Sequence, residues 1–220
     1  MNAPRFLPYG AAVLVLAAVV SLAAANSGGP PISSTGTPKI GSVPAEATCN
    51  RSGCHAGNAL NNGQGQIELL GLPAAYDPGA SYEVTVRLGS TSNSSASRRW
   101  GFEMTAVGAA DGKSTNAGTW TIGEELRKAS NPVRERDYVS HNFAGIHQGS
   151  ASPSEWTLTW NAPAEDQGTI LFYFAGNAAN GNGGPSGDFI YTGNLSLPGP
   201  GTPVEPLGWG ALKRLDLTRR

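Results

Sequence analysis

Charged side chains are scarce in this chain. Asp, Glu, Lys and Arg make up 14% of the 220 residues, compared with about 25% of residues in an average soluble domain. The formal net charge is -1 at pH 7, and no cluster of Lys and Arg stands out. Because nucleic-acid binding needs a clustered basic face, that function is not expected. Hydrophobic residues still amount to 39%, which favours a folded core over a disordered chain.

A hydrophobic run long enough to span a membrane is also missing. Residues 11–22 form an apolar run in which Ser21 is the one polar residue, and the run is shorter than the roughly 20 residues that a membrane-spanning helix needs. One charged residue, Arg5, precedes the run, small alanines follow it, and no Lys or Arg lies between the run and Lys39. This pattern predicts a signal peptide over residues 1–25 and an exported protein with no membrane span in its mature chain.

Catalytic motifs are not found. The sequence has no G-x-S-x-G element, the motif that presents the nucleophile in many hydrolases. The carboxylates that remain as candidates, Glu103, Glu155 and Asp188, are scattered, and solvated strand faces or turn caps explain them well. The sequence therefore does not predict an enzyme.

Glycine and proline, by contrast, are frequent, with 30 and 16 residues. They divide the chain into short segments, which is typical of a β-sandwich or barrel. A helical turn is conceivable over residues 124–128. The expected strands cover residues 66–70, 82–88, 100–109, 156–160, 169–175 and 188–192, and the fifth of these is expected to be central.

The strand over residues 100–109 carries large side chains at alternate positions. Trp100, Phe102, Met104 and Ala106 share one face, because successive side chains of a strand point to opposite sides. We therefore expect these four residues to pack in the core. The sequence as a whole predicts an all-β fold, an antiparallel β-sandwich.

The expected domain organisation has four parts. The signal peptide is followed by a flexible leader over residues 26–47, rich in Ser, Gly, Pro and Thr. One sandwich domain, residues 48–193, begins with a segment that contains both cysteines. Residues 194–220 form a Pro/Gly linker and a short basic tail, for which a docking role and a simple exposed terminus both remain open.

The two cysteines lie close together, and a histidine follows the second one: Cys49-Asn-Arg-Ser-Gly-Cys54-His55. Covalent attachment of a c-type haem uses two thiols and an adjacent histidine, although two residues usually separate the cysteines and here there are four. A Cys49–Cys54 disulfide is the default for paired thiols in an exported protein. A zinc site is a third alternative, but it is short of the usual four ligands.

A haem would also need a second axial ligand or an open position. His141 and His147 both lie in a polar stretch, residues 137–148. Met104 is a weaker candidate, because core packing explains it. The composition alone does not favour any one of these three residues as the second ligand.

Several segments together resemble the choice-of-anchor V domain, a bacterial exported module similar to the Reeler domain. The resemblance covers roughly residues 40–195, and its most specific part is FYFAGNAANGNG. The segments are the Cys–His segment, YDPGASYEVTV, WGFEMTA, AGTW, residues 138–141, TLTWNAP and FYFAGNAANGNG.

The resemblance implies an Ig-like, Reeler-like β-sandwich and a c-type haem. Cys49 and Cys54 would hold the macrocycle, and His55 and His141 would ligate the haem iron, with His147 and Met104 as weaker candidates. The expected function is electron transfer or redox sensing at the cell envelope with a redox partner protein. The alternative is a cofactor-free binding or adhesion module with a Cys49–Cys54 disulfide and a cell-surface ligand.

Overall fold

The computed structural model of the chain describes residues 27–51, 53–55, 57–109 and 115–201. The expected signal peptide, residues 1–25, and most of the expected C-terminal tail lie outside the described residues. In the part that is described, no helix is long and apolar enough to cross a membrane.

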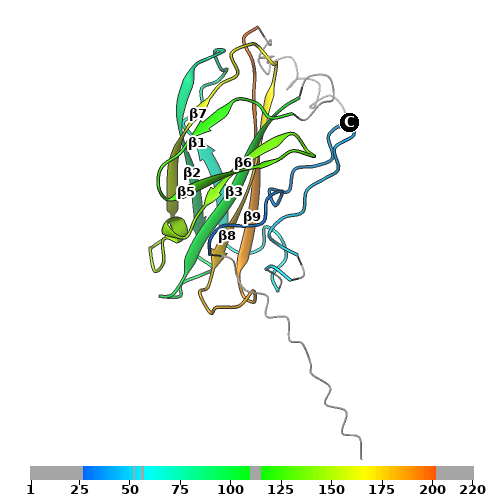
Figure 1. The fold of residues 1–220 in the computed structure, drawn as a ribbon. Coiled ribbons are helices and arrows are strands. Elements are labelled where there is room, and N and C mark those ends of the chain that lie inside the picture. Colours follow the sequence, from blue (N-terminus) through cyan, green and yellow to red (C-terminus); the bar gives the residue numbers. More distant parts are fainter. Residues whose placement is uncertain (1–26, 52, 56, 110–114, 202–220) are drawn as a thin grey trace, which may run out of the picture.

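The described chain forms two antiparallel β-sheets that pack face to face (Figure 1). One sheet has the strand order β1-β2-β7-β4 and the other has the order β5-β6-β3-β8-β9. This arrangement confirms the predicted all-β sandwich. The strands are β1 (Gly65–Leu70), β2 (Ser81–Ser90), β3 (Arg99–Gly108), β4 (Thr119–Thr121), β5 (Leu126–Asn131), β6 (Arg136–His141), β7 (Ser154–Asn161), β8 (Ile170–Ala179) and β9 (Phe189–Leu197), with a short 3₁₀ turn, η2 (Ala144–Ile146), between β6 and β7.

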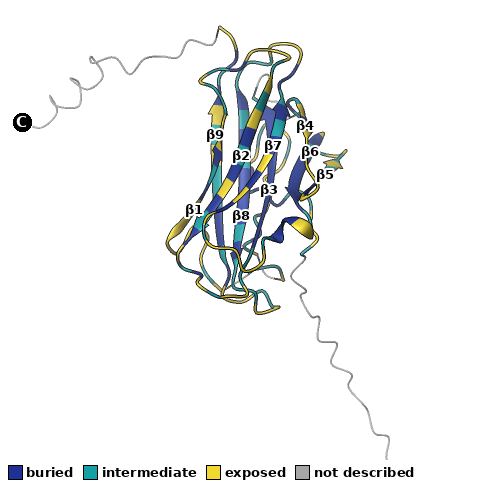
Figure 2. Cartoon of the chain, turned by 90° about the vertical axis from the view of Figure 1, so that its left-hand side faces the viewer, coloured by how far each residue is buried: buried dark blue, intermediate teal, exposed yellow. Residues whose placement is uncertain are grey.

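The core lies between the sheets and is built from alternate residues of facing strands. Figure 2 shows buried and exposed residues alternating along β2 and β7. On β3, the predicted core residues Trp100, Phe102, Met104 and Ala106 are all buried in one hydrophobic cluster. The ring of Phe102 lies 4.7 Å from that of Trp156 on the opposite sheet, so aromatic contacts join the two layers.

The prediction of a helical turn over residues 124–128 is wrong. Leu126–Asn131 is strand β5, which pairs with β6 along its whole length. The side chain of Asn131 accepts the backbone N–H groups of Val133 and Arg134 and so shapes the turn between the two strands. Strand β6 also pairs with β3, at Glu103 and Met104. Because β3 is distant in the sequence, a local pattern does not reveal this pairing, which favours strands over a helical turn here.

The polar stretch over residues 137–148 is likewise not one loop, because its first part is β6. The end of the domain also differs from the prediction at residue 193. Strand β9 pairs with β8 as far as Leu197, which is buried. Because Gly and Pro are frequent beyond residue 193, the sequence pattern did not indicate a strand over residues 194–197.

We expected a flexible leader over residues 26–47, but residues 27–47 pack onto the outer face of the five-stranded sheet (blue in Figure 1). The backbone N–H of Ser34 donates to Glu103 Oε2 over 2.6 Å, and Thr35 and Thr37 are buried. Polar residues hold this segment in place because they hydrogen-bond to buried groups of the sheet.

A buried ion pair fixes the far end of the same segment. Glu46 Oε1 lies 2.6 Å from Arg136 Nη1, and both side chains are inaccessible to solvent. The hydroxyl of Tyr138 donates to the same carboxylate oxygen. Since both charged groups are removed from water, their mutual contact offsets a large desolvation cost.

We therefore predict that Glu46→Gln lowers the free energy of unfolding by about 3–5 kcal/mol, because it removes the carboxylate from a buried guanidinium. The matched control is Glu155→Gln, which removes the exposed partner of Arg87; the two side chains of that pair are 51% and 44% exposed. The control should change stability by about 0–1 kcal/mol. Urea denaturation measures both variants, and equal losses would contradict the assignment.

Candidate functional site

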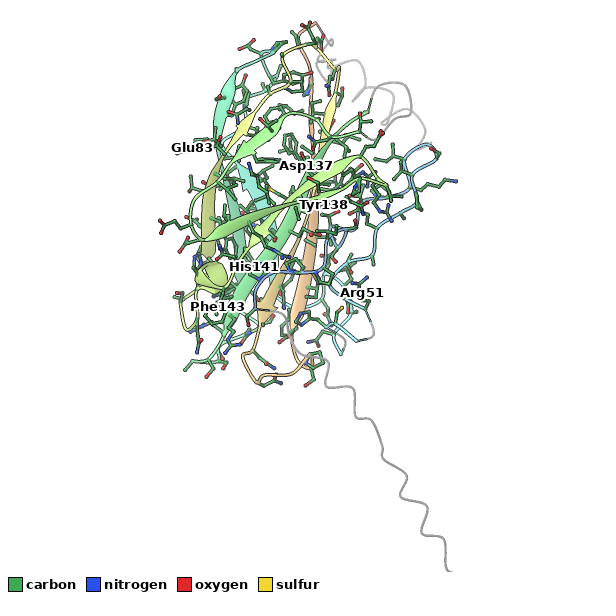
Figure 3. All side chains as sticks on the ribbon, in the orientation of Figure 1. Arg51, Glu83, Asp137, Tyr138, His141 and Phe143 are labelled. Carbon is green, nitrogen blue, oxygen red and sulfur yellow. The ribbon has the colours of Figure 1, made fainter. Side chains whose placement is uncertain are left out.

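A pocket of about 250 Å³ lies at the end of the sandwich where β6 ends and the loop between β8 and β9 turns. Cys49, Cys54, His55 and His141 all line it. Figure 3 shows His141 in this end of the five-stranded sheet and Arg51 on the neighbouring N-terminal segment. We call this space the cysteine–histidine pocket. It brings together the four residues that the sequence analysis selected.

The cysteine segment forms a tight turn that reverses the chain direction. The backbone N–H of Cys54 donates to Arg51 O, and the N–H of His55 donates to Cys49 O over 3.1 Å. Gly53 has φ +83°, a conformation that favours glycine. The turn thus places Cys54 and His55 beside Cys49, although four residues separate the cysteines.

The two sulfurs lie in different surroundings, and both are free thiols. Burial raises the pKa of Cys49 to about 12, and the nearby carboxyl of Glu103 adds to the effect. Cys54 is partly exposed, and the Nε–H of Arg51 donates to its sulfur over 3.2 Å. A thiolate on Cys54 would therefore have a cationic partner, whereas one on Cys49 would not be solvated.

His55 is held by a buried carboxylate. Its Nδ1 lies 2.6 Å from Asp188 Oδ2, and its Nε2 lies 3.1 Å from the amide nitrogen of Asn177. The other carboxylate oxygen of Asp188 accepts the backbone N–H of Asn180 over 2.8 Å. Asp188, which we had expected to be a solvated residue or a turn cap, is instead buried against a site histidine.

His141 is the last residue of β6, and its ring lies against the backbone of β3. Its Nδ1 lies 2.9 Å from the peptide nitrogen and 3.1 Å from the carbonyl oxygen of Phe102. Burial lowers the pKa of His141 to about 4, and the contact with Phe102 opposes this only in part. The imidazole is therefore neutral near pH 7, as a metal-ligating histidine must be.

His147 and Met104 do not line the pocket. His147 Nδ1 lies 2.5 Å from Ser154 Oγ, its Nε2 lies 3.2 Å from Glu125, and its ring stacks on Trp156. Met104 is buried in the core. The structure thus separates the two weaker candidates from the cysteines and from His55.

No group of three or more His, Cys, Asp and Glu side chains is placed to hold a metal ion in the part of the chain that the structure describes. A structural zinc site takes four such ligands. Within these residues, the cysteine–histidine pocket thus lacks the donor set of a bare zinc ion.

Glu103 is a second buried ionisable group next to the pocket, on the outer face of β3. Its Oε2 accepts the N–H of Ser34, and its Oε1 has no hydrogen-bond partner among the described residues. Burial raises the pKa of Glu103 to about 8. At neutral pH this carboxyl is therefore largely protonated.

Comparison with known proteins gives a likeness in fold only. No family model and no curated protein matches the chain. A human F-spondin reeler domain has a TM-score of 0.39 at 19% identity, covering 64% of this chain and 96% of that one. A cohesin module of a family 33 glycoside hydrolase from Clostridium perfringens ATCC13124 has a TM-score of 0.42 at 10% identity, covering 63% and 98%. Because both scores are below 0.5, the functional argument comes from the pocket alone.

Gly101 leaves room for the ring of His141. A Cβ atom at this position would lie 2.7 Å from Nε2 of His141, so we predict that Gly101→Ala displaces the ring and lowers stability by about 1–3 kcal/mol. At Gly123 a Cβ would meet nothing within 4 Å, and Gly123→Ala is the control. Imidazole resonances in NMR spectra and urea denaturation provide the two readouts. An unmoved His141 resonance in Gly101→Ala would disprove the close contact.

Glu103 should make the protein less stable as the pH rises. The folded state keeps the proton up to about pH 8, whereas the unfolded state loses it near pH 4.5. The free energy of unfolding should therefore fall between these values, by up to about 1.4 kcal/mol per pH unit. Glu103→Gln should remove this slope, and Glu83→Gln, at an exposed position, should retain it. Denaturation curves from pH 4.5 to 8 test the difference, and identical slopes would refute the assignment.

Proposed function

We propose that this chain is an exported binding module rather than an enzyme, and that its ligand occupies the cysteine–histidine pocket. One observation carries the proposal: His141, from a strand distant in sequence, lines the same pocket as Cys49, Cys54 and His55. A local disulfide alone would not require a buried, neutral histidine beside it.

The donor set of the pocket fits a covalently attached haem. Cys49 and Cys54 would form the two thioether bonds, and His55 and His141 would supply the axial nitrogens. The porphyrin provides the other four iron ligands, so two histidines suffice where a bare zinc ion would need more side chains. A haem held by His55 and His141 would supply a one-electron couple at this pocket. Electron transfer or redox sensing with a partner protein is the role that follows.

The side chains around the donors support this role. Trp100 and Phe102 also line the pocket, and both rings are buried. His141 is itself buried, and its neutral imidazole stays available as a ligand. Asp188 orients His55 from the other side through the contact with Nδ1.

The volume of the pocket favours a second function. About 250 Å³ is slightly below the range of roughly 300–1,000 Å³ that is usual for pockets of drug-sized ligands. A cofactor-free module with a Cys49–Cys54 disulfide needs no larger space. In that case the domain would bind a cell-surface ligand, and the pocket would be a smaller recognition site.

The decisive measurement is a visible absorption spectrum, together with an intact mass under denaturing conditions, of the chain expressed with a c-type haem maturation system. We expect a Soret band and a mass increment of one haem, because both thiols and both histidines lie at one pocket. A mass two hydrogens below that of the reduced chain, without a Soret band, would establish the disulfide-containing binding module instead.

Variants identify the second axial ligand. His141→Ala should change the visible spectrum, because it removes one of the two nitrogens proposed to bind the iron. His147→Ala is the matched control and should leave the spectrum unchanged, since His147 does not line the pocket. An unchanged spectrum in His141→Ala would remove His141 from the proposed ligand set.

A further inference from the structure

The ring of His55 is contacted on both nitrogens by residues that flank one loop. Asn177, near the end of β8, contacts Nε2, and Asp188, directly before β9, contacts Nδ1. All three residues line the cysteine–histidine pocket. The Gly/Asn-rich loop over residues 180–188 thus returns the chain so that two polar side chains enclose one imidazole.

These contacts determine where the ring carries its proton. The carboxylate of Asp188 only accepts hydrogen bonds, so Nδ1 must be the protonated nitrogen that donates to it. In the neutral ring, Nε2 then has the lone pair. The amide nitrogen of Asn177 lies 3.1 Å from Nε2 and 3.3 Å from Nδ1, so it lies against the face of the ring and not in line with that lone pair.

We propose that Asp188 is a positioning residue that fixes His55 as the Nδ1–H tautomer, so that the Nε2 lone pair remains for a ligand in the pocket. The part that concerns the ligand rests on the proposed function. The tautomer does not, because it follows from the contacts of the chain itself.

Asp188→Asn should invert the tautomer rather than merely weaken a contact. The backbone N–H of Asn180 needs the acceptor that Asp188 Oδ1 now provides. In the variant the amide oxygen would take that position, and the amide NH₂ would face Nδ1 of His55. Nδ1 would then have to be the acceptor, so the proton would move to Nε2 and occupy the lone pair that a ligand needs.

The first experiment determines the tautomer by long-range ¹H–¹⁵N NMR of the full mature chain, labelled at histidine and free of haem, at pH 7. We expect Nδ1–H for His55 in the wild type and Nε2–H in Asp188→Asn. Asp166→Asn is the control, because Asp166 also accepts a backbone N–H in a loop, from Gly168, but does not line the pocket. It should keep the wild-type tautomer. A proton on Nε2 in the wild type, or an unchanged tautomer in folded Asp188→Asn, would overturn the proposal.

The second experiment titrates the same proteins, with reduced cysteines, with ferric protoporphyrin IX and follows the Soret band. Asp188→Asn should bind about 10–100-fold more weakly than the wild type, as is typical when the partner of a ligating histidine is lost. Asp166→Asn should match the wild type. If the wild type binds the porphyrin, an equal affinity of Asp188→Asn would refute the positioning role.

The outcomes separate this proposal from the proposed function. If the wild type does not bind the porphyrin but shows the Nδ1–H tautomer, the haem proposal fails and the positioning role of Asp188 stands. If it binds the porphyrin with a proton on Nε2 of the free ring, the positioning role fails and the haem proposal stands. Should Asp188→Asn not fold, the wild-type tautomer still decides.

Discussion

Buried acidic side chains hold the segments without strands onto the sandwich. Glu46 contacts Arg136 of β6, the carboxyl of Glu103 of β3 accepts the N–H of Ser34, and Asp188 contacts His55. The N-terminal segment has few apolar residues, so hydrophobic burial alone would not fix it. A buried polar group without a hydrogen-bond partner is costly whether it is charged or neutral, and each of these three therefore contacts the segment that satisfies it.

The cysteine–histidine pocket exists because of this attachment. One wall is the N-terminal segment, with Pro30 and Ser34, and another is the start of β3. The cysteine turn follows this segment directly and is carried to the same end of the sandwich. Since the segment is docked by polar contacts rather than by a strand ladder, the pocket and the docking depend on the same few hydrogen bonds.

The sequence predicted the sandwich and the core face of β3 because alternation is a local pattern, and it singled out Cys49, Cys54 and His55 by their spacing, whereas His141 was selected through the family resemblance. It did not predict β5 or the position of His141 in a strand, since β5 pairs with β6, and β6 pairs with β3, far away in the chain. The packing of residues 27–47 and the burial of Asp188 were missed for a similar reason. A sequence pattern assigns polar residues to the solvent-exposed surface, and their burial becomes evident only when their hydrogen-bond partners, distant in the sequence, are known.

The two histidines of the pocket are held in different ways, His141 by strand pairing and His55 by side-chain contacts. His141 is the end of a strand that pairs with β3, and its Nδ1 faces a peptide group of that strand. Its position is therefore set by the ladder of the sheet. His55 belongs to a turn, and among the described residues its ring is held by side chains at the ends of a Gly/Asn-rich loop. A ligand that enters the pocket would thus meet an imidazole fixed by strand pairing on one side, and on the other an imidazole oriented by the carboxylate of Asp188.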